Sequence, residues 1–195
     1  MSYCEFCLNQ PADSIHRIYH DTQYGFPIQN DNELFERLVL EINQAGLSWD
    51  IILKKANNFR RAYDNFNIEK VAAYGEQDFS RLMNDVGIVR NRLKINAAIV
   101  NANRILHIQS QHGSFKHWLD KHRHYTKTEW TKLFKKTFVF TGGEIVNEFL
   151  MSIGYLDGAH QTDCPIRQKC DNALHKKSPI SEAIEQEVLL DNFSA

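Results

Sequence analysis

Apolar side chains recur along most of this chain every three to four residues, which is the period of an α-helix. The clearest run lies between Asn30 and Ala45, where the apolar positions share one helical face. Asn30 followed by Glu33 resembles a capping box, in which side chains bind the free amides at a helix start. The same period predicts further helices at about residues 48–63, 68–74, 76–86, 90–111, 114–121, 128–136 and 144–153, the last closed by Gly154.

No segment alternates between apolar and polar residues as a half-buried strand does, and only four prolines and nine glycines interrupt the helical pattern. The chain is therefore predicted to be all-α. Its 195 residues are enough for one core, or for two small lobes that share a groove. We expect a single domain over residues 1–170 and a polar tail over residues 171–195, with a short helix around Ile180 to Leu190.

The location and the charge of the chain narrow the range of functions. No apolar run approaches the roughly 20 residues that span a bilayer, and the N-terminus lacks the basic start and apolar core of a signal peptide. We therefore expect a cytoplasmic monomer with no membrane contact. The net charge of −1 gives no support to nucleic-acid binding, so such a function would require a local basic surface.

Four cysteines and nine histidines make a metal site worth considering, because disulfides are rare in a reducing compartment. His160 and Cys164 have the i, i+4 spacing that places two ligands on one helical turn or tight loop. Cys4 and His20 would supply the other pair of a four-ligand zinc site. Two pairings compete with this one, namely Cys4 with Cys7, and Cys170 with His175.

The stretch from Glu41 to Trp49 combines the features of a ligand site. A carboxylate lies near the end of an amphipathic helix, and after the break at Gly46 follow Leu47, Ser48 and Trp49. An ionised carboxylate only accepts hydrogen bonds, so it suits an amino group and attracts a cation. An aromatic face adds stacking and cation–π attraction, on the order of 1–2 kcal/mol for a desolvated cation. The stretch predicts a pocket for a base-sized ligand.

The string Gln44-Ala45-Gly46-Leu47-Ser48-Trp49 resembles the most distinctive motif of the DNA-3-methyladenine glycosylase I family, and Ile18–Gly25 resembles that family's Tyr-His-Asp segment. The resemblance covers about residues 1–110 well and returns from 134 to 165. It implies an all-α, two-lobed, helix-hairpin-helix glycosylase-like fold. It also implies a structural zinc that joins the N- and C-terminal segments through Cys4, His20, His160 and Cys164, and a base cage of Phe6, Tyr19, Tyr24 and Trp49 around Glu41.

Two further segments are candidates for DNA contact. An enzyme that acts on a base must flip it out of the duplex, and in this family the leucine corresponding to Leu47 fills the gap next to Gly46. Asp85–Arg90 resembles the hairpin of a helix-hairpin-helix motif, which predicts phosphate contacts at Gly87, Arg90 and Arg92. Between residues 116 and 136 lie seven Lys or Arg and only two acidic residues, a candidate for a second phosphate contact.

The resemblance also limits the chemistry. Many helix-hairpin-helix glycosylases carry a catalytic aspartate about twenty residues beyond the hairpin glycine, but Asn101–Ile108 contains no carboxylate. We therefore expect a monofunctional glycosylase without strand cleavage that removes N3-alkylated adenine from double-stranded DNA, with Glu41 as the catalytic-site residue that selects the base. The alternatives are an inert module that binds alkylated DNA and a zinc-stabilised helical regulator. The compact 122–136 region departs from the family and leaves the substrate range open.

Overall fold

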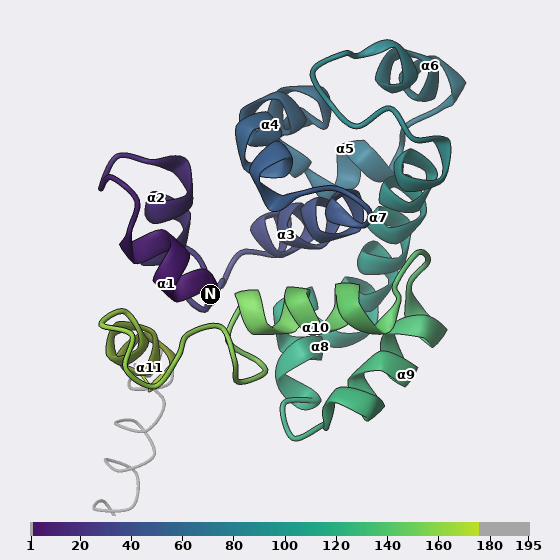
Figure 1. Cartoon of the computed structure of the whole chain (residues 1–195). Coiled ribbons are helices and arrows are strands. Elements are labelled where there is room, and N and C mark those ends of the chain that lie inside the picture. Colours follow the sequence, from purple (N-terminus) through teal and green to yellow (C-terminus); the bar gives the residue numbers. More distant parts are fainter. Residues whose placement is uncertain (1, 176–195) are drawn as a thin grey trace, which may run out of the picture.

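The computed structural model describes residues 2–175, and this part of the chain contains α-helices and one 3₁₀ turn but no strand (Figure 1). The all-α prediction is confirmed. The helices are α1 (Tyr3–Leu8), α2 (Ile15–Thr22), α3 (Asp31–Gln44), α4 (Trp49–Ala62), α5 (Ile68–Ala72), α6 (Glu76–Asn84), α7 (Arg92–His112), α8 (Phe115–Lys121), α9 (Lys127–Thr137), α10 (Gly143–Ser152) and α11 (Arg167–His175), and the 3₁₀ turn is η1 (Asp64–Phe66).

Helices α3 to α10 lie within a few residues of their predicted ranges, whereas α1, α2 and α11 were not predicted. The side chain of Asn30 accepts hydrogen bonds from the amides of Asn32 and Glu33, at 2.8 and 3.3 Å, and so begins α3 as expected. Helices α1 and α2 are short, with six and eight residues, and begin at the serine caps Ser2 and Ser14. Length alone does not explain why they were missed, because α5 and α8, with five and seven residues, were predicted.

Helices α3 and α7 form the centre of the main body and run antiparallel. Lys94 at the start of α7 donates to the carbonyls of Asn43 and Ala45 at the end of α3, at 2.9 and 2.6 Å. Near the other end of α7, Gln109 donates to Asp31 at the start of α3. The remaining helices pack around this pair, and the largest buried side chains of the core are Trp130, Tyr63, Phe35, Phe59, Phe66, Phe115, Phe134 and Phe149.

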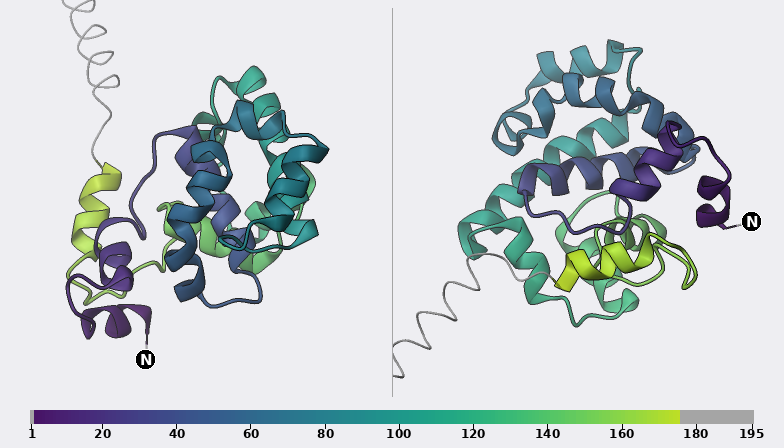
Figure 2. Two further views of the ribbon diagram at one scale, coloured as in Figure 1. Left: turned by 90° about the horizontal axis from the view of Figure 1, so that it is seen from above. Right: turned by 90° about the vertical axis from the view of Figure 1, so that its left-hand side faces the viewer.

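Helices α1, α2 and α11 lie together at one side of the main body (Figures 1 and 2). The Gly25 amide donates to the carbonyl of Ser152, so the segment after α2 is joined to the end of α10. Gly154 has a φ of +75° and closes α10 as predicted. The predicted domain boundary at residue 170 falls inside α11, and the predicted helix around Ile180 to Leu190 lies outside the described residues. None of the helices described is both long and apolar enough to span a membrane.

Candidate active site and metal centre

A cavity of about 250 Å³ lies where the α1–α2 segment meets the end of α3, the start of α4 and the middle of α10. Four of the five residues predicted to bind a base line it together. Three further residues of the lining were not predicted. The complete lining is Tyr3, Tyr19, Tyr24, Glu41, Gln44, Trp49 and Glu148.

Glu41 is the most deeply buried acid of this cavity, with 5% of its surface exposed. It lies in the last turn of α3, on the side of that helix that carries Arg37 one turn earlier. Burial raises the pKa of Glu41 to about 8; the Arg37 guanidinium opposes this shift and the Glu148 carboxylate adds to it. At neutral pH the carboxyl of the empty cavity is therefore largely protonated, and a cation that enters the cavity favours its ionised form.

Glu148 supplies a second carboxylate to the same cavity. It projects from α10, where it is half-buried, and its Oε2 accepts a hydrogen bond of 3.4 Å from the Tyr24 hydroxyl. Burial also raises the pKa of Glu148, although its bond from Tyr24 opposes the change. Burying a carboxylate is costly unless it has a task, but α10 also carries the exposed Glu144, so the sequence alone could not single out Glu148.

Aromatic rings form the walls of the cavity. The Tyr19 ring lies 5.2 Å from the ring of Trp49 and 5.7 Å from that of Tyr24, and the Tyr3 ring meets Tyr24 edge to face at 5.6 Å. Arg37 donates to the Tyr19 hydroxyl at 3.0 Å and lies over its ring, which fixes this wall from outside. The indole N–H of Trp49 is buried and has no hydrogen-bond partner in the part of the chain described.

Phe6 is not in the lining, although it was predicted to be. Its ring packs against Tyr3 at 6.3 Å and edge-on against His16 at 5.2 Å. Tyr3 takes the place in the wall, and its hydroxyl is hydrogen-bonded to Nδ1 of His16 at 3.2 Å. Because Tyr3 and Phe6 are three residues apart on one short helix, they share a face, and the sequence pattern could not decide which ring reaches the cavity.

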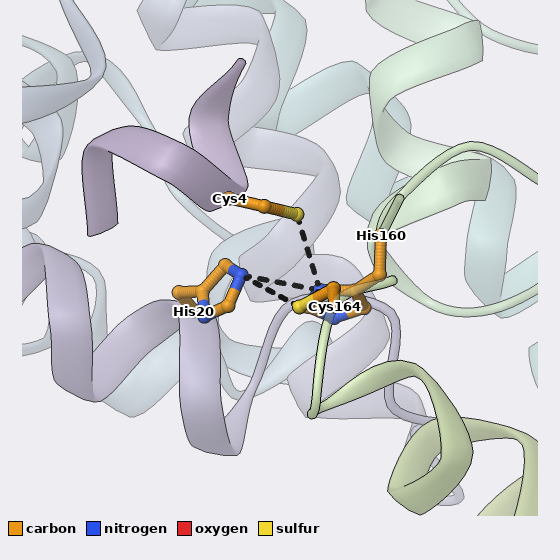
Figure 3. Close-up of side chains that lie close together, drawn as sticks. All are labelled: Cys4, His20, His160 and Cys164. Atoms are coloured by element: carbon orange, nitrogen blue, oxygen red, sulfur yellow. Dashed lines mark hydrogen bonds between the residues drawn. The ribbon is translucent and has the colours of Figure 1, made fainter. Parts of the chain in front are cut away.

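Cys4, His20, His160 and Cys164 meet beside the cavity, as Figure 3 shows. All four side chains are buried, and their ligand atoms lie within 4.8 Å of one another. The separations are 3.2 Å between His160 Nδ1 and His20 Nε2, 3.6 Å from Cys164 Sγ to each of these nitrogens, and 3.8 Å from Cys4 Sγ to His160 Nδ1. A tetrahedral zinc with bonds of about 2.0–2.3 Å holds its ligand atoms roughly 3.3–3.8 Å apart, so the four residues fit this ion.

In each of the two histidines, the ring nitrogen that points away from the cluster already has a hydrogen-bond partner. His20 Nδ1 lies 2.6 Å from the Asp21 carboxylate, and His160 Nε2 lies 2.8 Å from the carbonyl oxygen of Tyr24. Both partners only accept, so each of these nitrogens carries the proton and the other nitrogen of each ring presents a lone pair. Two lone pairs that face each other at 3.2 Å cannot hydrogen-bond, and a cation between them removes the repulsion.

Cys7 and Cys170, the thiols of the two competing pairs, are not part of this cluster. The Cys7 thiol donates to the carbonyl of His16 at 3.5 Å, and the Cys170 thiol donates to the carbonyl of Tyr24 at 3.7 Å. Both thiols are buried, and burial raises the pKa of each. They therefore serve as small apolar residues in the packing of the terminal segments.

Two of the segments predicted to face DNA follow α3 and α6 directly. Gly46 has a φ of +79° with open space around it, and Leu47 is half-buried against the core. The hairpin between α6 and α7 is held from α4, because Lys55 and Asn58 donate to the Gly87 carbonyl at 3.0 and 3.2 Å. Arg90 is exposed, and so is Arg92 at the start of α7, whose guanidinium lies 5.0 Å from the ring centre of Phe79.

The fold is all-α, and its aromatic-walled cavity, which bears two carboxylates, has the chemistry to hold a flat ring that carries an amino group or a positive charge. The family model for methyladenine glycosylase matches residues 9–134. A DNA-3-methyladenine glycosylase of Haemophilus influenzae is 33% identical over 173 residues, 79% of this chain and 93% of the relative. DNA-3-methyladenine glycosylase 1 of Escherichia coli is 43% identical over 103 residues, 53% of this chain and 55% of that protein.

Solved structures of 3-methyladenine DNA glycosylase I are also similar to this chain. The structure of 3-methyladenine DNA glycosylase I from Staphylococcus aureus has a TM-score of 0.75 at 33% identity and covers 85% of this chain and 97% of its own. A variant of 3-methyladenine DNA glycosylase I in complex with 3-methyladenine has a TM-score of 0.76 at 34% identity, with the same coverage. The chain belongs to the DNA-3-methyladenine glycosylase I family, as its motifs predicted.

Proposed function

We propose that this protein is a DNA repair enzyme that removes N3-alkylated adenine from double-stranded DNA and leaves an abasic site. The observation that carries the proposal is the cavity itself, in which Glu41 and Glu148 face an enclosure of four aromatic rings. Burial disfavours ionisation of both the buried Glu41 and the half-buried Glu148, so a positively charged ligand that stabilises their ionised forms is favoured in this cavity. An N3-alkylated adenine carries that charge while it is attached to the sugar.

Recognition and catalysis then use the same contacts. The Glu41 carboxylate accepts from the exocyclic amine, while Trp49 and Tyr19 lie against the ring. The alkylated base leaves as a neutral molecule without being protonated, so cleavage needs no acid. Water attacks the oxocarbenium-like sugar, and the rate gain comes from holding the base and sugar in place while most water is excluded. The region from Asn101 to Ile108 offers no carboxylate to the sugar, which limits the enzyme to weakened bonds.

We assign a structural zinc to Cys4, His20, His160 and Cys164. Four protein ligands leave no coordination position for water, so the ion, when bound, supplies stability and no chemistry. Its effect on the active site is indirect. His20 directly follows Tyr19 in α2, and His160 binds the carbonyl of Tyr24, so the ligands hold two walls of the cavity in place.

For the DNA we propose a helix-hairpin-helix contact and a plug. The hairpin between α6 and α7, with Gly87, Arg90 and Arg92, binds the phosphate backbone. Leu47 fills the space from which the base is flipped, with the open Gly46 beside it allowing the backbone to approach closely. In this proposal the helices form two lobes, with the DNA across the face between them.

A catalytically inert module that binds alkylated DNA would use the same cavity and the same surface. Release of 3-methyladenine separates the two functions. Duplex DNA carrying radiolabelled methyl groups is incubated with the protein, and the free bases are resolved by chromatography. We expect 3-methyladenine to appear well above the spontaneous rate, with no strand break until the abasic sites are cleaved by alkali. Release at the spontaneous rate alone would refute the enzyme and support the inert binding module. Metal analysis of the same preparation is expected to give about one zinc per chain.

A further inference from the structure

Phe140, in the loop between α9 and α10, combines backbone strain with exposure. Its φ is +59°, a left-handed conformation that bulky residues rarely adopt, and 37% of its surface is exposed. The other left-handed non-glycine residues of the described chain form the single turn Asp64–Phe66, where the ring of Phe66 is completely buried. Burial offsets the strain at Phe66. Nothing within the described structure offsets it in the same way at Phe140.

Buried polar groups hold the backbone on both sides of Phe140. The side chain of Asn101, which is fully buried in α7, accepts from the Val139 amide at 2.9 Å and donates to the Val139 carbonyl at 3.1 Å. On the other side, the buried Thr141 hydroxyl lies 3.1 Å from the Phe134 carbonyl and donates to it. One turn further along α7, Arg104 donates to the Thr137 carbonyl at 2.7 Å. Strain of this kind persists only where neighbouring groups dictate the conformation, and it concentrates at functional sites.

The same helix anchors both this loop and the loop that carries the proposed DNA plug. Lys94 and Asn101 are seven residues apart, so they lie on one face of α7 about two turns, or roughly 10 Å, from each other. Lys94 holds the carbonyls of Asn43 and Ala45, directly before Gly46 and Leu47. Lys94 thus holds the loop that carries Leu47, and Asn101 holds the loop that carries Phe140.

The loop also leads into a helix that lines the cavity, and it follows a basic stretch. Helix α10 starts at Gly143, immediately after the loop, and carries Glu148 into the cavity. Lys135 and Lys136, both exposed, end α9 a few residues before Phe140. An exposed aromatic ring next to lysines, on the proposed DNA-binding side, is typical of a contact with bases and phosphates.

We propose that Phe140 is a second apolar contact with the duplex, and that its ring packs against the DNA beside the flipped nucleotide while Leu47 fills the vacated position. This inference rests on the proposed function. The strained backbone keeps the ring presented before DNA arrives, so no ordering cost is incurred when the duplex binds.

The test uses Phe140→Gly, because glycine adopts this φ without strain and the ring is lost. Binding is measured by fluorescence anisotropy on a duplex that contains an abasic-site analogue, with 2-aminopurine placed next to or opposite the analogue in separate duplexes. We expect duplex affinity to fall on the order of tenfold, and the 2-aminopurine signal that the wild-type protein induces to be lost in at least one placement. Binding of free 3-methyladenine and the thermal midpoint should not decrease. Ile18→Ala, which trims an apolar side chain of similar exposure on α2 outside the cavity lining, is the matched control and should bind as the wild type does.

Wild-type duplex affinity and 2-aminopurine signal in Phe140→Gly would overturn the proposal. An equal loss in Ile18→Ala would do so as well, because the effect would not then be specific to this loop. Failure of the proposed function looks different: the wild-type protein would release no 3-methyladenine, while the duplex-binding comparison still decides whether Phe140 contacts DNA. A wild-type protein that bound no duplex would overturn both.

Discussion

Replacing Glu41 with glutamine removes the charge that we assign to base selection and keeps the shape of the side chain. A carboxylate and a cationic base about 4 Å apart attract by about 4 kcal/mol at an effective dielectric constant of 20. At pH 7 the buried carboxyl, with its pKa of about 8, must first be ionised, which costs about 1.4 kcal/mol. The remaining 2–3 kcal/mol corresponds to roughly a hundredfold loss in kcat/KM for Glu41→Gln at pH 7.

The pH dependence gives the sharper measurement. Since kcat/KM reports the free enzyme, the wild-type value should rise about tenfold per pH unit up to pH 8 and then level off. Glu41→Gln should show no such rise, so its deficit should widen to roughly a thousandfold at pH 9. The assay is release of 3-methyladenine from methylated duplex DNA at subsaturating concentration, with the spontaneous rate subtracted at each pH. Glu33→Gln, an exposed acid at the other end of α3, is the control.

Glu41→Gln, which should lower activity, should raise the free energy of unfolding at alkaline pH. The pKa of Glu41 is higher in the folded protein than its ordinary value of 4.5, so the stability that this carboxyl contributes is complete below pH 4.5 and is lost as the pH rises toward 8. Glu41→Gln should therefore be the more stable protein at pH 8, by on the order of 3–4 kcal/mol, with the difference vanishing near pH 4.5 in urea titrations. A variant that keeps the wild-type pH profile of kcat/KM, or that loses activity only by unfolding, would refute this account of Glu41.

Three further predictions concern the frame around the site. Gly154→Ala should lower the free energy of unfolding by about 1–3 kcal/mol. Its φ is +75°, and a Cβ would lie 2.6 Å from a methyl of Leu174 and 3.1 Å from the Gly25 carbonyl. A denaturant titration measures the loss, and an unchanged midpoint would contradict the prediction. Chelation of the proposed zinc, or Cys164→Ser, should make residues 1–25 sensitive to protease before the rest of the chain. Mass spectrometry of the fragments follows the cleavage. Uniform cleavage throughout the chain would argue against a local role of the metal site in holding the N-terminal segment. Lys94→Met should leave the two carbonyls at the end of α3 without their partner and lower the free energy of unfolding by about 1–3 kcal/mol. It should also weaken duplex binding more than binding of free 3-methyladenine. Equal losses in both would mean that the loop after α3 does not touch DNA.

The sequence predicted those parts of the structure where a period or a motif repeats often enough to be recognised. The apolar stripe of α3 and its cap at Asn30 fixed the helix that carries Glu41, and the i, i+4 pair His160 and Cys164 proved to lie together with Cys4 and His20. Helices α1, α2 and α11 were missed because their packing is decided by residues far along the chain, whereas α5 and α8, which are no longer than α2, were predicted. The choice between Tyr3 and Phe6 depends on how α1 docks, and no local pattern contains that information.

Glu148 and Phe140 show two different reasons for a missed residue. Glu148 shares its helix with the exposed Glu144, and its partner Tyr24 lies 124 positions away, so no local pattern indicated which acid reaches the cavity. Phe140 reads as one more aromatic residue in a run of them. Its significance lies in a backbone angle imposed by Asn101 and Thr141, and only coordinates report it.

The contact between the two ends of the chain also sets an order of assembly during synthesis. Helices α3 to α10 share one large core, which can form once they have left the ribosome. Tyr19 and Tyr24 belong to a separate small cluster, and the segment that carries them is fastened by Ser152 and His160, which are made more than a hundred residues later. A chain interrupted before residue 160 would keep its core but leave one wall of the cavity unattached. Only the finished polypeptide can enclose a base, so truncated products are not expected to act on DNA.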